Sequence, residues 1–461
     1  MKKIAFFCIP AHGHTNPMTG VAEELVRRKD QVRFYSFAPF EEKIRATGAE
    51  FISCDRFLTS LTKNEEAGLK RVSSTEMAVQ DIRITKRMDA FLSEELTSFQ
   101  PDVIFSDSVC FWGKLSAVKH RIPLVISTST FAFNELSSGY IRSSAGELLD
   151  ILLGLPKIRK ELKTLEPLGY HTDNVLNLIR SDNSNDNIVY TSRRFQPFAR
   201  SFSDHYLFAG PSVRKDYPLK KKADKPLIYI SMGTVINKRP EFYQKCISAL
   251  KDIDAEIILS CGNAIDPASL NPLPENVRVF ASVDQKEVLS GASLFLTHCG
   301  MNSVSESLFF GVPMILFPQT NEQKAVAARA AELGAGILLE EENEAKIRAA
   351  AEQLLQNPKY TEAAMLCRED FLSSLGIPGA ADFIESAPHQ GNGTDPLKEL
   401  HEKTGKVMTV YYGLDVLLYL FLKYAVRFPH AGLAGMLIGI SGLPLRSAFM
   451  KKLYKKLETK S

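Results

Sequence analysis

Histidine, amide and hydroxyl side chains stand at the start of a predicted helix, a position that suits phosphate binding. The apolar run Leu294–Leu296 predicts a strand, and a glycine turn ending at Gly300 follows it. A helix is expected to open at Asn302 and Ser303, because Asn and Ser are preferred N-cap residues. Its free backbone N–H groups and its dipole attract anions. With His298 at the mouth, the segment indicates a diphosphate site, and therefore chemistry on a nucleotide.

Carboxylate and amide side chains further along could hold sugar hydroxyls. Glu306 is expected one turn into the helix, where it can accept hydrogen bonds from a ribose diol. After one more apolar run, Glu322 and Gln323 place a carboxylate beside an amide, a pair suited to two or three hydroxyls of a sugar. Thr234, in a glycine turn after another predicted strand, would reach the diphosphate from the opposite wall.

The string from His298 to Gln323 resembles the donor-binding signature of family 1 UDP-sugar-dependent glycosyltransferases, and the resemblance spans roughly residues 1 to 387. It implies an α/β protein of the GT-B type, with two facing Rossmann-like doubly wound domains and a ligand in the cleft between them. Strands that alternate with helices along both halves favour the same class. The implied activity is transfer of a sugar from a nucleotide to an acceptor hydroxyl.

Transfer to a hydroxyl needs a base, and histidine titrates in a suitable pH range. His14 follows the first predicted strand, at the carboxyl edge where open α/β sheets bind ligands. The family has its base in such a Gly-His-x-Asn-Pro segment, and His12 is the competing candidate. Asp107, at the end of a later strand, matches the family's paired aspartate and would orient the imidazole. Asp102 is the weaker candidate for that role.

The segment before the main motif departs from the family pattern. The family has an aromatic residue there that stacks on uracil, followed by proline two positions on, whereas this chain has Ser282 and Asp284. Val283 can still offer its backbone to the base, and Gln285 can still reach the ribose. The lost stacking is worth about 0.5–1.5 kcal/mol, unless Phe280 replaces it. UDP is the expected nucleotide and dTDP is the alternative.

Length and composition bound the remaining possibilities. The 461 residues favour two domains, expected at 1–213 and 227–388 with a linker at 214–226, followed by a helical extension at 389–461. A net charge of +3 gives no reason to expect nucleic-acid binding. Seven scattered cysteines, with no CxxC pair, suggest free thiols in the cytoplasm. No Asp-x-Asp lies near the donor motif, so we expect no metal and no cofactor.

The C-terminal extension combines apolar runs with basic clusters. The runs Val407–Leu422 and Ala431–Leu445 are each shorter than the ~20 residues that a spanning helix needs. From Gly391 onward, 11 Lys/Arg and 5 Asp/Glu give a net charge of +6. Such a pattern suggests helices that lie on an anionic membrane surface. The alternatives are a helical hairpin docked on the body and a spanning segment.

The function expected from these residues is inverting transfer of a hexose, glucose by preference, from a UDP-sugar to a small acceptor. His14 would deprotonate the acceptor, and a membrane-bound extension would favour a lipophilic one. Two alternatives remain: a UDP-sugar 2-epimerase of the same fold, and a non-catalytic sugar-nucleotide-binding partner protein. Neither needs both His14 and Asp107.

Overall fold

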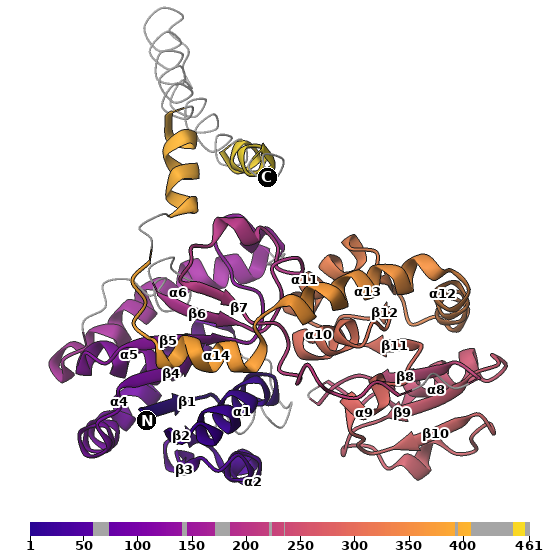
Figure 1. The fold of residues 1–461 in the computed structure, drawn as a ribbon, viewed down its shortest axis with the longest axis horizontal. Helices are drawn as coiled ribbons and strands as arrows, with labels where there is room; N and C mark the ends of the chain where they lie inside the picture. Colours follow the sequence, from indigo (N-terminus) through magenta and orange to yellow (C-terminus); the bar gives the residue numbers. More distant parts are fainter. Residues whose placement is uncertain are drawn as a thin grey trace, which may run out of the picture.

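Two α/β domains, each built on a parallel sheet, lie side by side in the computed structural model (Figure 1). The structure describes residues 1–58, 73–140, 145–170, 185–220, 224–234, 236–391, 395–406 and 446–456. The expected fold class is confirmed. The strands are short apolar runs, because helices cover both faces of a parallel sheet and so bury its side chains on both sides.

The first domain is built on a seven-stranded sheet with the order β3-β2-β1-β4-β5-β6-β7, all neighbours parallel. Its strands are β1 (Lys3–Phe7), β2 (Gln31–Ser36), β3 (Glu50–Ser53), β4 (Val103–Asp107), β5 (Leu124–Thr128), β6 (Asp186–Val189) and β7 (Tyr206–Phe208). Its helices are α1 (His12–Arg27), α2 (Glu41–Ala46), α4 (Ser74–Phe99), α5 (Phe111–His120) and α6 (Ala145–Lys163). The strand order reverses between β1 and β4, so ligands are expected at the carboxyl ends of these two strands.

The second domain is built on a six-stranded parallel sheet with the order β10-β9-β8-β11-β12-β13. Its strands are β8 (Leu227–Ser231), β9 (Glu256–Ser260), β10 (Val277–Phe280), β11 (Leu294–Thr297), β12 (Met314–Leu316) and β13 (Gly336–Leu338). The helices that follow are α8 (Pro240–Leu250), α9 (Gln285–Leu289), α10 (Met301–Phe309), α11 (Asn321–Glu332), α12 (Glu344–Gln356) and α13 (Pro358–Ser373). Here the order reverses between β8 and β11, the strands that precede Thr234 and His298.

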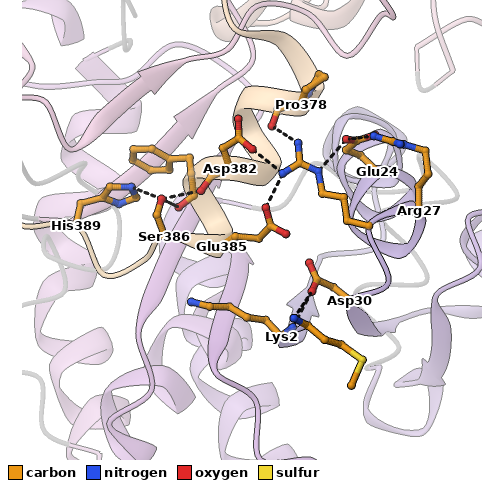
Figure 2. A network of polar contacts seen from close by, with 12 residues as sticks. Lys2, Glu24, Arg27, Asp30, Pro378, Asp382, Glu385, Ser386 and His389 are labelled. Atoms are coloured by element: carbon orange, nitrogen blue, oxygen red, sulfur yellow. Dashed lines mark hydrogen bonds and ion pairs between the residues drawn. The ribbon is translucent and has the colours of Figure 1, made fainter.

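The last helix of the predicted second-domain range, α14 (Gly376–Glu385), packs against the first domain. Its residues Ala380, Ala381 and Ile384 belong to the core that covers one face of the first sheet. Figure 2 shows the polar side of this contact around Asp382, Glu385 and Glu24. Arg28, which follows α1, donates to the carboxylates of Asp382 and Glu385. The chain therefore returns to the first domain after it completes the second.

Two helical segments of the extension, residues 396–406 and 446–456, pack on the first domain. Leu400, Met450 and Tyr454 form an apolar cluster with Leu136 of the body. Glu135 forms ion pairs with a histidine and an arginine of the extension. The runs Val407–Leu422 and Ala431–Leu445, on which the membrane prediction rests, lie outside the described residues. Among the helices that are described, none is both long and apolar enough to cross a bilayer.

Candidate functional site

His14 and Asp107 meet because they follow neighbouring strands at the point where the first sheet reverses its order. The His14 Nδ1 atom lies 2.6 Å from Asp107 Oδ2. Asp107 is fully buried, and its Oδ1 accepts the Val109 backbone N–H at 3.0 Å. When the ring is neutral, a carboxylate at Nδ1 keeps the proton there and leaves the lone pair on Nε2. The arrangement is that of an imidazole oriented for proton abstraction.

Electrostatics around His14 favour its protonated form. Burial alone would lower the pKa of His14, but the negative charge and hydrogen bond of Asp107 outweigh it, with a further contribution from Glu322, so this pKa is raised. Asp107 belongs to the first domain, whereas Glu322 belongs to the second and begins α11. His12, the competing candidate, is exposed, and burial and Lys43 lower its pKa.

Two residues near this pair carry no signal in the sequence that points to them. The Ser129 hydroxyl, just after β5, lies 3.0 Å from His14 Nδ1. Lys114, on α5, is buried and donates to the Ser108 carbonyl, which fixes the turn that follows Asp107. Burial lowers the pKa of Lys114 to about 8. Both positions depend on how β4, β5 and α5 pack, which the spacing of residues does not reveal.

The first turn of helix α1 makes a contact between the domains. The helix starts at His12 and contains Pro17. Proline has no N–H, so it cannot donate to the carbonyl of Gly13 one turn before it. The Asn302 side-chain amide, from α10 of the second domain, donates to that carbonyl at 3.0 Å. The turn that carries His14 is thus connected directly to the predicted diphosphate site.

The predicted N-cap of α10 is wrong, because the helix begins at Met301 and its N-cap is Gly300, two residues before Asn302. Cys299 takes a left-handed conformation with φ of 67°, and the chain then enters the helix with Gly300 at the N-cap position. Asn302 and Ser303 therefore lie inside the first turn, and neither is used for capping. The Asn302 amide instead donates to the Gly13 carbonyl, and the Ser303 hydroxyl lies near Gln285.

His298 lies between two glycines at the carboxyl ends of β8 and β11. A Cβ atom on Gly233 would come within 2.5 Å of the imidazole ring, and one on Gly300 within 2.7 Å. Burial lowers the pKa of His298 to about 4, against a smaller opposing effect of the Ser231 backbone, so the ring is neutral near pH 7. A neutral imidazole can donate one hydrogen bond to a phosphate oxygen. Thr234, on the adjoining loop, is exposed.

The residues predicted to meet the ribose come together at one side of α10. Gln285 Nε2 donates to Glu306 Oε2 at 2.6 Å and lies 3.4 Å from the Ser303 hydroxyl. Asp284, which replaces the family's proline, caps α9 by accepting the N–H groups of Lys286 and Glu287. Asp284 in place of proline therefore has a local structural role. Val283 packs its side chain on the second-domain core, while Ser282 and Phe280 are exposed.

The predicted sugar-binding pair begins α11. Thr320 is the N-cap, and the Gln323 side-chain oxygen accepts the backbone N–H groups of Gln319 and Thr320. This capping box occupies the carbonyl of Gln323 but not its NH2 group. Glu322 is exposed and acts electrostatically on His14. The two residues thus lie at the same helix end, on the side of the second domain that acts on His14.

Two Rossmann-like domains, with the predicted diphosphate site on one and a His14 ring that contacts Asp107 on the other, are the features expected of a GT-B glycosyltransferase. The comparisons agree. Residues 244–379 match the family described as "Erythromycin biosynthesis protein CIII-like, C-terminal domain". The chain is 32% identical over 396 residues to "NDP-glycosyltransferase YjiC" of Bacillus licheniformis, covering 84% of this chain and 97% of that protein.

A second relative, "Uncharacterized UDP-glucosyltransferase YojK" of Bacillus subtilis, is 30% identical over 406 residues, with 85% of this chain and 98% of that protein covered. The crystal structure of CalG4, the calicheamicin glycosyltransferase, superposes with a TM-score of 0.72 at 27% identity, covering 84% of this chain and all of that one. The chain belongs to the antibiotic-type family 1 glycosyltransferases, enzymes that use nucleotide-sugar donors.

Proposed function

We propose that the protein transfers a hexose, with glucose as the preferred sugar, from a UDP-sugar to a hydroxyl of a small lipophilic acceptor, with inversion at the anomeric carbon. The observation that carries this proposal is the 2.6 Å contact between His14 and Asp107, joined to the donor side through Asn302 and Gly13. Neither a 2-epimerase nor a non-catalytic binding protein needs a base arranged for an external acceptor.

In the proposed reaction, His14 Nε2 takes the proton of the acceptor hydroxyl as its oxygen attacks the anomeric carbon. The bond between that carbon and the diphosphate oxygen breaks, and UDP leaves with the electron pair. Asp107 stabilises the imidazolium that forms. The first-turn N–H groups of α10, with Ser303 and His298, stabilise the charge that develops on the diphosphate. Attack from the side opposite the leaving group gives inversion.

The donor assignments follow the order of residues across the second domain. Glu322 and Gln323 would bind the sugar beside His14. Gly300, Asn302, Ser303 and Thr234 would bind the diphosphate. Gln285 and Glu306 would bind the ribose, and the backbone of Val283 would meet the base. The exposed Ser282 offers no ring to a base, so dTDP stays an alternative to UDP.

The test incubates the purified protein with UDP-glucose and a panel of hydrophobic phenols and alcohols. Mass spectrometry detects glycosides, and proton NMR assigns their anomeric configuration. We expect β-glycosides from the parent and none from His14→Ala. An unchanged rate in His14→Ala would overturn the mechanism, and conversion of UDP-glucose without acceptor would favour the epimerase. UDP binding without any turnover would favour the binding protein.

A peripheral contact between residues 391–461 and an anionic membrane is also proposed, because this part combines a +6 charge with two apolar runs. Sedimentation with phosphatidylserine vesicles tests it. The full chain should sediment with these vesicles and not with phosphatidylcholine vesicles, and a chain that ends at Pro388 should sediment with neither. Equal binding by both chains would refute the contact.

A further inference from the structure

Lys43, on α2 of the first domain, lies at the place where the first turns of α1 and α10 meet. Its Nζ atom donates to Asn16 Oδ1 at 2.6 Å. Asn16 is in the same turn of α1 as Gly13, whose carbonyl accepts the Asn302 amide of α10. Lys43 therefore lies beside the predicted diphosphate site, although it belongs to the opposite domain.

The charges around Lys43 leave its ammonium group without a matching anion. Lys286 of the second domain acts on it from across the interface, Glu306 opposes that effect more weakly, and His12 lies on its own side. The carboxylate of Glu41 on α2 pairs with Arg45. Within the described residues, neither Lys43 nor Lys286 forms an ion pair with a carboxylate.

Lys43 has the properties of a residue at the edge of an open interface. Its side chain is exposed to solvent, yet surrounding protein and then Lys286 lower its pKa. Like charges that face each other across a boundary oppose its closure, and an anion between them removes the repulsion. A phosphate group meets this requirement, because it accepts charge-assisted hydrogen bonds from ammonium groups.

We propose that Lys43 binds the phosphate of the donor that lies nearest the nucleoside. This inference rests on the proposed donor, a nucleoside diphosphate sugar. The proximal phosphate is the one specified because Lys43 reaches the first turn of α10 through Asn16 and the Gly13–Asn302 hydrogen bond, and the next turn of α10 carries Glu306, which Gln285 contacts and which is expected to bind the ribose. Lys43 is thus a binding residue supplied by the domain that also carries the base.

The test measures binding of UDP, UMP and uridine to the full-length parent, Lys43→Met and Lys43→Arg by titration calorimetry. Loss of a charge-assisted hydrogen bond should weaken UDP and UMP binding to Lys43→Met by about tenfold or more. Uridine should bind the parent and Lys43→Met equally, and Lys43→Arg should keep most of the UDP affinity. The difference in UDP affinity between the parent and Lys43→Met should shrink as the salt concentration is raised, because the contact is exposed and therefore screened.

Arg45→Met is the matched control, because Arg45 lies on the same helix but pairs with Glu41 and stacks on Phe51. It should bind UDP as the parent does, and thermal unfolding should show that all variants fold. Parental UDP affinity in Lys43→Met would overturn the inference and leave the proposed function intact. An equal loss of uridine binding would overturn it in favour of a ribose contact. A parent protein that binds no UDP would instead refute the proposed donor.

Discussion

Replacing Asp107 with asparagine should disable His14 by placing its proton on the wrong nitrogen. Asp107 accepts two hydrogen bonds, from Val109 N–H at 3.0 Å and from His14 Nδ1 at 2.6 Å. An asparagine has one oxygen and one NH2 group for these two places. If its oxygen turns to His14, the Val109 N–H loses its acceptor, which costs about 1–3 kcal/mol. The NH2 group is therefore expected to face His14.

The consequence is a tautomer that cannot accept a proton at Nε2. With NH2 at Nδ1, this nitrogen must accept the hydrogen bond, so the ring proton moves to Nε2, which faces away from Asp107. The carboxylate that stabilises the imidazolium is also lost. We expect kcat/KM to fall by about 10²–10⁴-fold. The free-energy cost of restoring the reactive tautomer sets the lower limit, and the loss of the negative charge that stabilises the imidazolium increases the effect.

The pH profile gives an independent readout. Asp107 raises the pKa of His14, so its removal should lower that pKa. Transfer needs neutral His14, so activity rises with pH through this pKa, and the acidic limb of kcat/KM should move to lower pH in Asp107→Asn. Product formation from UDP-glucose, followed by liquid chromatography and mass spectrometry between pH 5 and 9, measures both effects.

Asp102→Asn is the control for Asp107→Asn, because Asp102 was the other candidate aspartate in the same segment. Its Oδ2 accepts the Lys3 backbone N–H at 2.7 Å, at the opposite end of β1 from His14. This variant should keep the parental rate and pH profile. A folded Asp107→Asn protein with parental kcat/KM would refute the assignment of His14 as an oriented base.

Three further predictions concern the framework of the site. Asn302→Ala removes one interdomain hydrogen bond worth about 0.5–1.5 kcal/mol, so kcat/KM should fall by about 2- to 12-fold, and an unchanged value would show that this link does not position His14. The pKa of His298 is about 4 in the folded protein against 6.5 normally, so the unfolded chain binds more protons between these pH values. The free energy of unfolding should therefore rise with pH across this range, by up to about 3 kcal/mol. Urea unfolding should show a smaller rise with pH in His298→Asn, and an equal rise would contradict the burial argument. Arg28→Ala should lower the free energy of unfolding by about 1–3 kcal/mol because it leaves Asp382 and Glu385 without the cation that they share, whereas Arg27→Ala, which removes only an exposed pair with Glu24, should change it little.

The fold class and the pairing of His14 with Asp107 were open to prediction for one physical reason. Apolar runs such as Leu294–Leu296 are too short for helices and too apolar for exposed strands, so they indicate buried parallel strands. The carboxyl ends of such strands share one edge of a sheet. A histidine after β1 and an aspartate after β4 therefore approach each other whenever these strands are neighbours, as they are here.

The local details at helix ends were harder, because they depend on backbone angles that residue types only bias. Asn302 and Ser303 are good capping residues, yet the left-handed Cys299 moves the N-cap to Gly300. The capping box of Gln323 did have a signal, since Thr320 and Gln323 stand three residues apart as that motif requires. Gln323 is therefore a capping residue as well as a predicted sugar ligand.

Contacts between the domains were outside the reach of a pattern-based prediction, because they join segments far apart in the chain. The Asn302–Gly13 hydrogen bond spans 289 positions, and the Arg28–Glu385 contact spans 357. No periodicity connects such residues. Residues 59–72 and 171–184 lie outside the described residues, and the lipophilic acceptor is predicted from the extension alone.

Helix α1 shows how His14 can keep its alignment with the predicted donor site on the other domain. Its first turn carries His14 and bonds to α10 through Gly13, and Arg28, just after its last turn, bonds to α14. Helix α10 connects β11 and β12 of the second sheet, and α14 follows that sheet in the chain, so both ends of α1 are attached to segments joined to the second sheet. A helix of 16 residues is about 24 Å long. The position of His14 relative to α10 therefore depends on one helix held at two points, and Pro17, which costs a helical hydrogen bond, is what makes the Gly13 carbonyl available for the first of them.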